Sequence, residues 1–243
     1  MSKLSVCIAV YNGEKYIEEQ LVSILGQLTS TDEVIISDDG SRDGTVAILD
    51  KIDDPRVKFF LNNSGKHGVV PNFENAIKHA SGDVIFLSDQ DDIWLPNKVS
   101  MVLKRLQNCD FVIHNASITD SSGTPNGEDY FSLRKSRYGY IQNIIKMGYL
   151  GCCMAFKRDC LKFILPFPKH ILWHDMWIAA ILHLFYRGIM MDESLILYRR
   201  HGDNASPTTE KSGYSLFFRL KYRFYILIFS LLRIFNFFHI KRK

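Results

Sequence analysis

The segment Val84-Ile85-Phe86-Leu87-Ser88-Asp89-Gln90-Asp91-Asp92 runs from a short apolar stretch directly into three acids within four residues. Val34-Ile35-Ile36-Ser37-Asp38-Asp39-Gly40-Ser41 has the same pattern earlier in the chain. Apolar runs of this length, rich in branched side chains, predict buried strands. Both strands end in carboxylates, which are therefore expected at the edge of a sheet where ligands of α/β proteins bind.

The surrounding sequence extends this alternation of strands and helices. Further strands are predicted at residues 4–10, 57–61 and 111–114. Apolar residues at helical spacing predict helices at 17–28, 48–52, 73–80 and 99–106. This order is typical of an α/β fold with a mostly parallel central sheet flanked by helices. The second half is less regular, with a helix predicted at 174–186 and a strand at 195–198.

Composition limits the class of protein. The chain has 243 residues, of which 47% are hydrophobic and 23% charged, as expected for one folded unit with a large core. The net charge of +4 is too small to favour nucleic-acid binding. Five cysteines without a C-x-x-C pair favour a reduced, cytosolic compartment, and no secretory signal is expected in the apolar start at 4–10.

The acidic cluster Asp89-Gln90-Asp91-Asp92 suggests a metal site. Three carboxylates this close repel one another unless a cation compensates them, and oxygen ligands suit Mg²⁺ or Mn²⁺. Because Mg²⁺ usually takes one or two protein carboxylates together with substrate phosphates, a diphosphate substrate is expected. The alternative for 89–92 is a solvated loop. For 38–41 the alternative is a turn held by Asp38, with Ser41 as a helix cap.

Three segments together carry a family resemblance. Ala9-Val10-Tyr11-Asn12, Val34–Asp43 and Leu87–Trp94 resemble successive signatures of the inverting glycosyltransferases of family 2, which have the GT-A fold. Three segments are similar to those of a rhamnosyltransferase-like subgroup that builds bacterial surface polysaccharides. They are the Asp-Gln-Asp-Asp-Ile-Trp form, His174-Asp175-Met176-Trp177 and Tyr198–Asn204. The resemblance covers about residues 4 to 204.

The resemblance implies transfer of a sugar from a UDP- or dTDP-sugar, with dTDP-rhamnose as one candidate. The acceptor would be a hydroxyl of a lipid-linked oligosaccharide in capsule, O-antigen or exopolysaccharide assembly. The implied nucleotide-binding residues are Val10, Tyr11, Glu14, Asp38 and Asp39. The implied metal-site residues are Asp89 and Asp91, with Asp92 as the near alternative to Asp91. His201, in the loop after the strand predicted at 195–198, is a further candidate contact to metal or diphosphate; the alternative for this lone histidine is a surface or structural residue.

Asp175 is the implied catalytic base. Its position alone, at the start of a predicted helix, favours a helix cap or an acid that interacts with the helix dipole. The resemblance favours the base, which must reach the acceptor hydroxyl on the face opposite the leaving diphosphate. The implied acceptor-binding residues are Gly151, Cys152, His174 and Trp177, and the alternative for residues 151–153 is a buried turn of small residues.

The C-terminal segment is expected to form a separate appendage. We divide the chain into a catalytic domain, 1–212, with a nucleotide-binding half (1–115) and an acceptor-binding half (116–212), and a basic, aromatic helical tail, 213–243. On a helical wheel, one narrow polar stripe interrupts the apolar surface of the tail; its residues are Arg219, Arg223, Ser230 and Arg233. Arg233 argues against a transmembrane helix, so the tail is expected to lie on the anionic cytoplasmic face of the membrane. The alternative is a helix packed on the domain or across a dimer.

Two other functions compete with transfer. A non-catalytic module that binds nucleotide sugars or divalent metal would retain Asp39 and Asp91 without needing Asp175. A sugar-nucleotide pyrophosphorylase should carry a glycine-rich phosphate loop after the first strand, and residues 10–14 lack one. The sequence contains neither a G-x-G-x-x-G motif nor a P-loop at a strand end, which argues against dehydrogenases and P-loop enzymes.

Overall fold

The computed structural model describes residues 2–202 and 215–240. Several features predicted from the sequence lie outside the described residues, namely the boundary between residues 212 and 213, Asn204, Tyr214 and the basic end 241–243.

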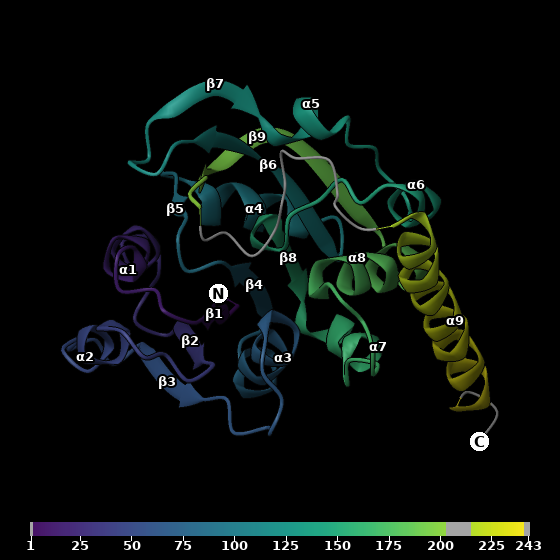
Figure 1. Cartoon of the computed structure of the whole chain (residues 1–243), viewed down its shortest axis with the longest axis horizontal. Coiled ribbons are helices and arrows are strands. Elements are labelled where there is room, and N and C mark those ends of the chain that lie inside the picture. The colour runs from purple at the N-terminus through teal and green to yellow at the C-terminus, as the bar shows by residue number, and fades with distance from the viewer. Residues whose placement is uncertain (1, 203–214, 241–243) are drawn as a thin grey trace.

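The first half of the chain forms a parallel sheet, as predicted. Its strands are β1 (Leu4–Val10), β2 (Glu33–Asp38), β3 (Val57–Leu61) and β4 (Val84–Ser88). Strand β1 lies between β2 and β4, and β3 extends the sheet from β2, all in parallel. Helices α1 (Ile17–Leu25), α2 (Thr45–Leu49) and α3 (Val69–His79) connect these strands (Figure 1). The carboxyl ends of β1, β2 and β4 therefore share one edge.

The second half continues the same sheet with mixed pairing. Its strands are β5 (Ile93–Trp94), β6 (Phe111–Thr119), β7 (Pro125–Asp129), β8 (Met154–Lys157) and β9 (Gly188–Arg199). Strand β8 is antiparallel to both β4 and β6, whereas β6 and β9 are parallel. Strand β5 pairs with β9 at the far end of the sheet, although it follows β4 after only four residues. The sheet therefore curls around the loop at 89–92.

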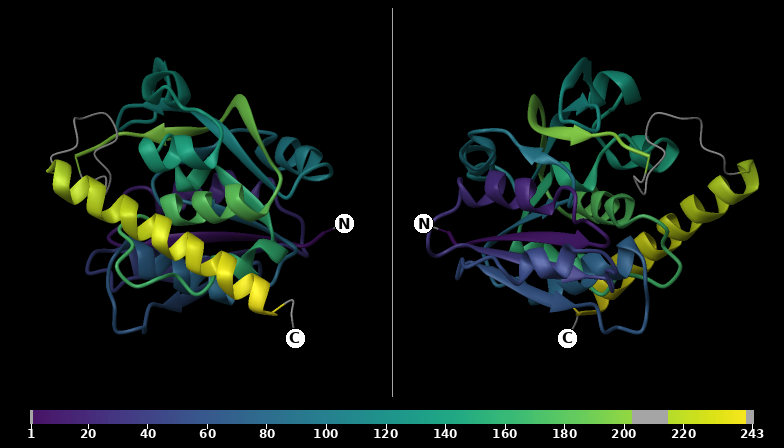
Figure 2. Two further views of the ribbon diagram at one scale, coloured as in Figure 1. Left: turned by 90° about the vertical axis from the view of Figure 1, so that its right-hand side faces the viewer. Right: turned by 60° about the vertical axis from the view of Figure 1, so that its left-hand side comes forward.

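Helices cover this mixed half. They are α4 (Lys98–Leu106), α5 (Tyr130–Arg134), α6 (Tyr140–Ile145), α7 (Leu161–Ile164) and α8 (His174–Phe185), with short 3-10 turns η1 (Gly151–Cys153) and η2 (Arg158–Cys160). The last helix, α9 (Leu216–Ile240), packs against α8 and α6 at the edge of the domain (Figures 1 and 2). Among the described residues, no helix is both long enough and apolar enough to span a bilayer.

One hydrophobic core joins both halves of the sheet. The inward side chains of the central strands are completely buried, as Val6, Ile35, Phe86 and Phe111 illustrate. All five cysteines are buried and none forms a disulfide. A core that is continuous across the sheet holds the loops at its carboxyl edge in a fixed relation to one another.

Candidate active site

The acidic loops after β2 and β4 meet at the end of β1. The backbone N–H of Asp39 donates to the Val10 carbonyl at 2.9 Å. On the other side, Gln90 accepts from the Tyr11 N–H at 2.8 Å and donates to the Tyr11 carbonyl at 3.1 Å. A Cβ at Gly13 would lie 2.7 Å from Gln90 Oε1, so a glycine leaves room for this pairing. The loops predicted to converge are therefore bonded to adjacent residues at the end of β1, the loop after β2 to Val10 and the loop after β4 to Tyr11.

Asp38 holds the turn after β2. Its carboxylate accepts from the N–H groups of Gly40 and Ser41, each at 2.9 Å, and from the Ser41 hydroxyl. Gly40 has a φ of +86°, a conformation that favours glycine. The turn interpretation thus describes Asp38, whose side chain is fully engaged in orienting the next residue, Asp39.

Asp39 is a buried acceptor in a polar pocket. Its Oδ1 accepts from Asn62 Nδ2 at 2.7 Å and lies 3.2 Å from His67 Nδ1, and its Oδ2 accepts from the Gly68 N–H at 2.6 Å. Tyr11, half exposed, follows the β1 residue that binds Asp39. The three partners belong to the loop between β3 and α3. Sequence reasoning missed them because they carry no recognisable motif.

Glu14 links two loops at the same edge. Its Oε2 accepts from the Gly44 N–H at 2.6 Å, and its own N–H donates to Asp43 at 3.2 Å. A Cβ at Gly44 would lie 2.9 Å from Glu14 Oε2, so the contact requires a small residue there. Glu14 remains solvent-exposed and joins the loop after β1 to the loop after β2.

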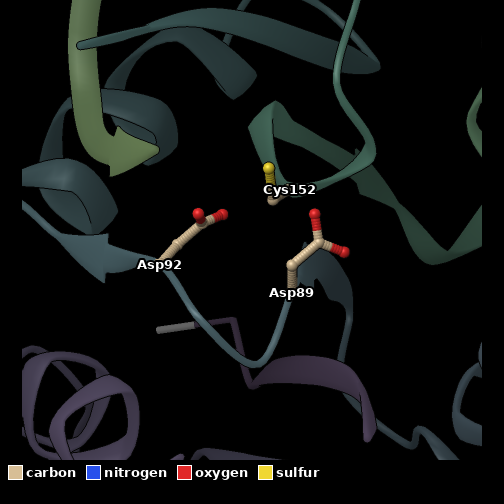
Figure 3. Close-up of side chains that lie close together, drawn as sticks. All are labelled: Asp89, Asp92 and Cys152. Atoms are coloured by element: carbon tan, nitrogen blue, oxygen red, sulfur yellow. The ribbon is translucent and has the colours of Figure 1, made fainter. Parts of the chain in front are cut away.

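Asp89 and Asp92 lie close together beside Cys152. Figure 3 shows both carboxylates directed toward the sulfur from the two ends of the loop. The candidate ligand atoms of these three residues lie within 4.8 Å of one another. Asp92 Oδ1 accepts from the Arg199 N–H at 3.2 Å, whereas its buried Oδ2 has no hydrogen-bond partner among the described residues. A buried carboxylate oxygen without a partner is costly and suits a cation.

Electrostatics support this interpretation. Burial, with the neighbouring Asp91, raises the pKa of Asp89 to about 7 and that of Asp92 well above its ordinary value. Burial also raises the pKa of the Cys152 thiol well above its ordinary value, which keeps the thiol protonated. The two carboxylates therefore fit a hard divalent ion that would replace their protons, and Cys152 fits as a neighbour rather than a ligand.

Lys98 is a charged residue of this site that sequence reasoning missed. It is buried at the start of α4, where Nζ donates to the Cys152 carbonyl at 2.9 Å and lies 3.9 Å from the centre of the Trp94 ring. Burial lowers its pKa to about 8, and its charge lowers the pKa of Asp89. Lys98 therefore partly compensates the carboxylates. A single lysine at the start of a helix gives no sequence signal for this role.

Asp91 points to a different partner from its two neighbours. Its Oδ2 lies 2.8 Å from His201 Nε2, and the His201 ring packs on Tyr16 with 4.9 Å between ring centres. His201 follows β9, where Arg199 forms an ion pair with Glu19 at 2.6 Å. The structure thus places His201 against the acidic loop, where its partner is Asp91.

Asp175 lies in the first turn of α8. Its Oδ1 accepts from the Met176 N–H at 2.7 Å, and burial raises its pKa to about 6. The charge of Asp175 in turn contributes to the raised pKa of Asp89. This electrostatic coupling links the start of α8 to the acidic loop after β4.

His174 and Gly151 are packed together. The His174 ring stacks on Phe73 with 3.9 Å between ring centres, and a Cβ at Gly151 would lie only 2.5 Å from His174 Nε2. Burial lowers the pKa of His174 to about 3, so the ring is neutral. Neither ring nitrogen has a hydrogen-bond partner among the described residues. A neutral imidazole with free nitrogens is thus held directly beside Asp175.

Trp177 is completely buried in the core. It is 0% exposed, its Nε1 donates to the Ile164 carbonyl at 2.9 Å, and the Arg233 guanidinium lies 5.7 Å from the ring centre. The ring therefore packs α8 against α7 and α9. Since a fully buried ring has no surface to offer a sugar, we do not include Trp177 in the proposed acceptor site.

Comparison with known proteins gives the family. The model of "Glycosyl transferase family 2" matches residues 5–165. The chain is 30% identical to the dTDP-rhamnosyl transferase RfbG of Shigella flexneri, over 89% of this chain and 77% of the relative. It is 33% identical to a UDP-Glc:alpha-D-GlcNAc-diphosphoundecaprenol beta-1,3-glucosyltransferase, WfgD of Escherichia coli, over 55% of each chain.

Solved structures show the same fold. Staphylococcus aureus TarS 1-349 in complex with UDP-GlcNAc superposes with a TM-score of 0.72 at 20% identity, over 96% of this chain and 67% of TarS. The mannosyltransferase PcManGT of Pyrobaculum calidifontis, in complex with GDP-Man and Mn²⁺, gives 0.61 at 21% identity, over 88% of this chain and 59% of that one. The predicted GT-A-type fold is confirmed. Since the matched residues run from β1 through β8 and include both acidic loops, this chain belongs to glycosyl transferase family 2.

Proposed function

We propose that this protein is a metal-dependent, inverting glycosyltransferase that moves a sugar from a UDP- or dTDP-sugar to a hydroxyl of a lipid-linked saccharide. The observation that carries the proposal is that the two acidic loops are bonded to adjacent residues at the end of β1, the loop after β2 to Val10 and the loop after β4 to Tyr11. A nucleotide site beside Asp39 and a diphosphate site beside Asp89–Asp92 would then be adjacent at one edge of the sheet. A sugar nucleotide has this combination of a base and a charged diphosphate.

The donor base is proposed to bind at Asp39. Uracil and thymine each carry a ring N–H that can donate a hydrogen bond to a carboxylate. Asn62 and Gly68 hold the Asp39 carboxylate in place for this contact. Val10, Tyr11 and Glu14 would line the base and ribose. The names of RfbG and WfgD, a dTDP-rhamnosyl and a UDP-glucose transferase, support a pyrimidine nucleotide.

Mg²⁺ or Mn²⁺ is proposed to bind the acidic loop, through Asp91 with Asp89, Asp92 and His201 as the neighbouring candidates. The unpaired Oδ2 of Asp92 and the raised pKa values of Asp89 and Asp92 support this assignment. The ion would compensate the charge that builds on the departing diphosphate, an effect worth several kcal/mol. The structurally similar mannosyltransferase PcManGT was solved in complex with GDP-Man and Mn²⁺.

Asp175 is proposed as the general base. A pKa of about 6 leaves the carboxylate ionised at neutral pH yet basic enough to accept a proton from an attacking hydroxyl. The Met176 N–H fixes one carboxylate oxygen, so the other is available to the acceptor. Gly151 and the neutral His174 would line the acceptor side, with Cys152 behind them. Attack from this side, opposite the diphosphate, inverts the anomeric centre.

The enzyme is proposed to work at the cytoplasmic face of the membrane, held there by 213–243. We retain the division into a nucleotide half (1–115), an acceptor half (116–212) and this tail. WfgD, whose name specifies a diphosphoundecaprenol acceptor, supports a lipid-linked substrate.

A panel of nucleotide sugars tests the proposal. With Mn²⁺ and a diphosphoundecaprenol-linked sugar as acceptor, one donor should yield free UDP or dTDP and a lengthened lipid-linked product. Melting of the protein with each donor, with and without Mn²⁺, identifies the nucleotide independently of the acceptor. Metal-dependent binding of a donor without any transfer, across a panel of acceptors, would instead favour a non-catalytic nucleotide-sugar module.

A further inference from the structure

Helix α9 is turned so that its polar stripe faces the protein. Ser230 is completely buried, and Arg233 donates to the Pro166 carbonyl while covering Trp177. The apolar side chains at helical spacing are instead exposed to solvent; they are Phe217, Leu220, Phe224, Leu227, Ile228, Leu231, Leu232 and Phe235. Ile226 is buried as well, so α9 has apolar side chains on both its inward and its outward face. A helix on the surface of a soluble protein exposes mainly polar side chains, so this outward apolar face is expected to contact something apolar.

Helix α6 has the same orientation. Asn143 is buried, where it donates to the Gly139 carbonyl at 2.7 Å and accepts from the Gly148 N–H at 3.3 Å. Ile141 and Ile145, one helical turn apart, are 62% and 63% exposed. Two helices far apart in sequence thus both bury polar groups and expose aliphatic side chains.

The two helices form one surface. They pack against each other, and the Tyr140 hydroxyl is hydrogen-bonded to Ser230. Both lie on the face that is turned to the viewer in the left view of Figure 2, with α9 running across it. An apolar partner that covers α9 at this junction can therefore also reach α6.

Charge indicates which partner fits. No acid occurs between Asp129 and Asp159, and none follows Glu210, so neither segment has a negative side chain. Exposed basic side chains lie on α9 and close to α6 in the sequence, namely Lys135, Arg137, Lys146 and Lys221. A second copy of this surface would bring like charges together, whereas an anionic lipid leaflet complements both the charge and the aliphatic groups.

We infer that α6 is a second membrane-contact element, which forms with α9 a single surface that rests on an anionic lipid leaflet. The inference rests on the proposed membrane association and deepens it. Docking through both helices brings the acceptor half against the lipid, since both helices pack on α8, whose first turn carries Asp175.

Vesicle binding of the full chain tests this inference. Vesicles of phosphatidylcholine with about one third phosphatidylglycerol are compared with phosphatidylcholine alone by co-sedimentation. Replacing the two exposed isoleucines of α6 (Ile141→Ser with Ile145→Ser) is expected to lower partition onto the anionic vesicles by about tenfold or more, because two aliphatic side chains no longer enter the leaflet. The matched control is Val22→Ser with Leu61→Ser, two exposed apolar residues of α1 and β3 on the side away from α9, with no expected change (Figure 1).

The outcomes separate the two claims. Equal binding by the wild type and the α6 variant overturns the role of α6 while the tail remains a membrane anchor. A wild type that binds neither vesicle overturns both the membrane association and this inference. Sedimentation velocity gives a third outcome. If the wild type is a dimer and the α6 variant is a monomer, the surface binds a second copy of the chain, and the inference of lipid contact is overturned.

A substitution that adds a reporter covers the case in which the double variant fails to fold. Ile141→Trp is expected to show fluorescence quenching by vesicles with bromine-labelled acyl chains, beyond the quenching of the wild type. Equal quenching of the two proteins would contradict contact of α6 with lipid.

Discussion

Asp175→Asn should separate the catalytic role of this residue from its effect on stability. In the wild type, Asp175 Oδ1 accepts a hydrogen bond from the Met176 N–H at 2.7 Å. The amide oxygen of asparagine can accept the same bond, so the first turn of α8 should keep its geometry. What the substitution removes is a buried negative charge and a proton acceptor. The variant is therefore expected to be more stable and much less active.

The size of the stability effect follows from the raised pKa. The pKa of Asp175 is 3.8 in the unfolded chain and about 6 in the folded protein, so between pH 3.8 and about 6 the folded state binds the proton more tightly. The wild type thus loses stability as pH rises through this window, by at most about 3 kcal/mol. The variant has no such loss, so near pH 8 it should melt higher by roughly 6–12 °C, and below about pH 4 the difference should vanish.

Thermal melts across pH and a transfer assay measure the two effects together. Transfer should fall by roughly 10²–10⁴-fold, the usual contribution of a general base, while binding of the nucleotide remains. Asp53→Asn, at an exposed acid, is the control and should change stability by less than about 0.5 kcal/mol. Wild-type turnover by Asp175→Asn would refute the base, and an unchanged melting temperature near pH 8 would refute the buried-charge argument.

Three further predictions follow from other contacts. Without divalent ions, the wild type should lose stability as pH rises toward about 7, because Asp89, whose pKa is raised to about 7, then loses its proton and becomes charged inside the protein. Mn²⁺ should restore the melting temperature of the wild type but not of Asp92→Asn, and equal recovery of both would exclude Asp92 from the site. Gly151→Ala should cost about 1–3 kcal/mol of unfolding free energy, because its Cβ would meet the stacked His174 ring. Gly202→Ala, which meets nothing within 4 Å, is the control, and equal melting temperatures would contradict the packing argument. Asp39→Ala should raise the KM for the donor by about tenfold or more with a smaller change in kcat, and steady-state kinetics with an unchanged KM would remove Asp39 from the nucleotide site.

The sequence was sufficient for local structure and for the position of the acidic loops. The predicted strand at 4–10 is β1, and the predicted helix at 174–186 is α8 to within one residue. These elements have clear hydrophobic periods and well-marked turns, and strand ends deliver Asp39 and Asp89 by geometry alone. The alternative turn role of Asp38 also followed from its side-chain chemistry.

Long-range packing was beyond the sequence. The pairing of β5 with β9 joins residues about one hundred positions apart, and no local pattern encodes it. The partners Asn62 and His67 of Asp39, and the buried Lys98, are single polar residues whose roles depend on tertiary contacts. The direction of the polar stripe of α9 depends on what the helix packs against, since a helical wheel is unchanged by rotating the helix.

The most direct test of the central claim is anomalous diffraction at the manganese edge from crystals grown with Mn²⁺ and UDP. The account predicts a manganese peak in contact with a carboxylate of the Asp89–Asp92 loop and with the diphosphate, and a uracil ring beside Asp39 and Tyr11. Nucleotide bound away from the carboxyl ends of β1, β2 and β4, or manganese without a contact to this loop, would contradict it.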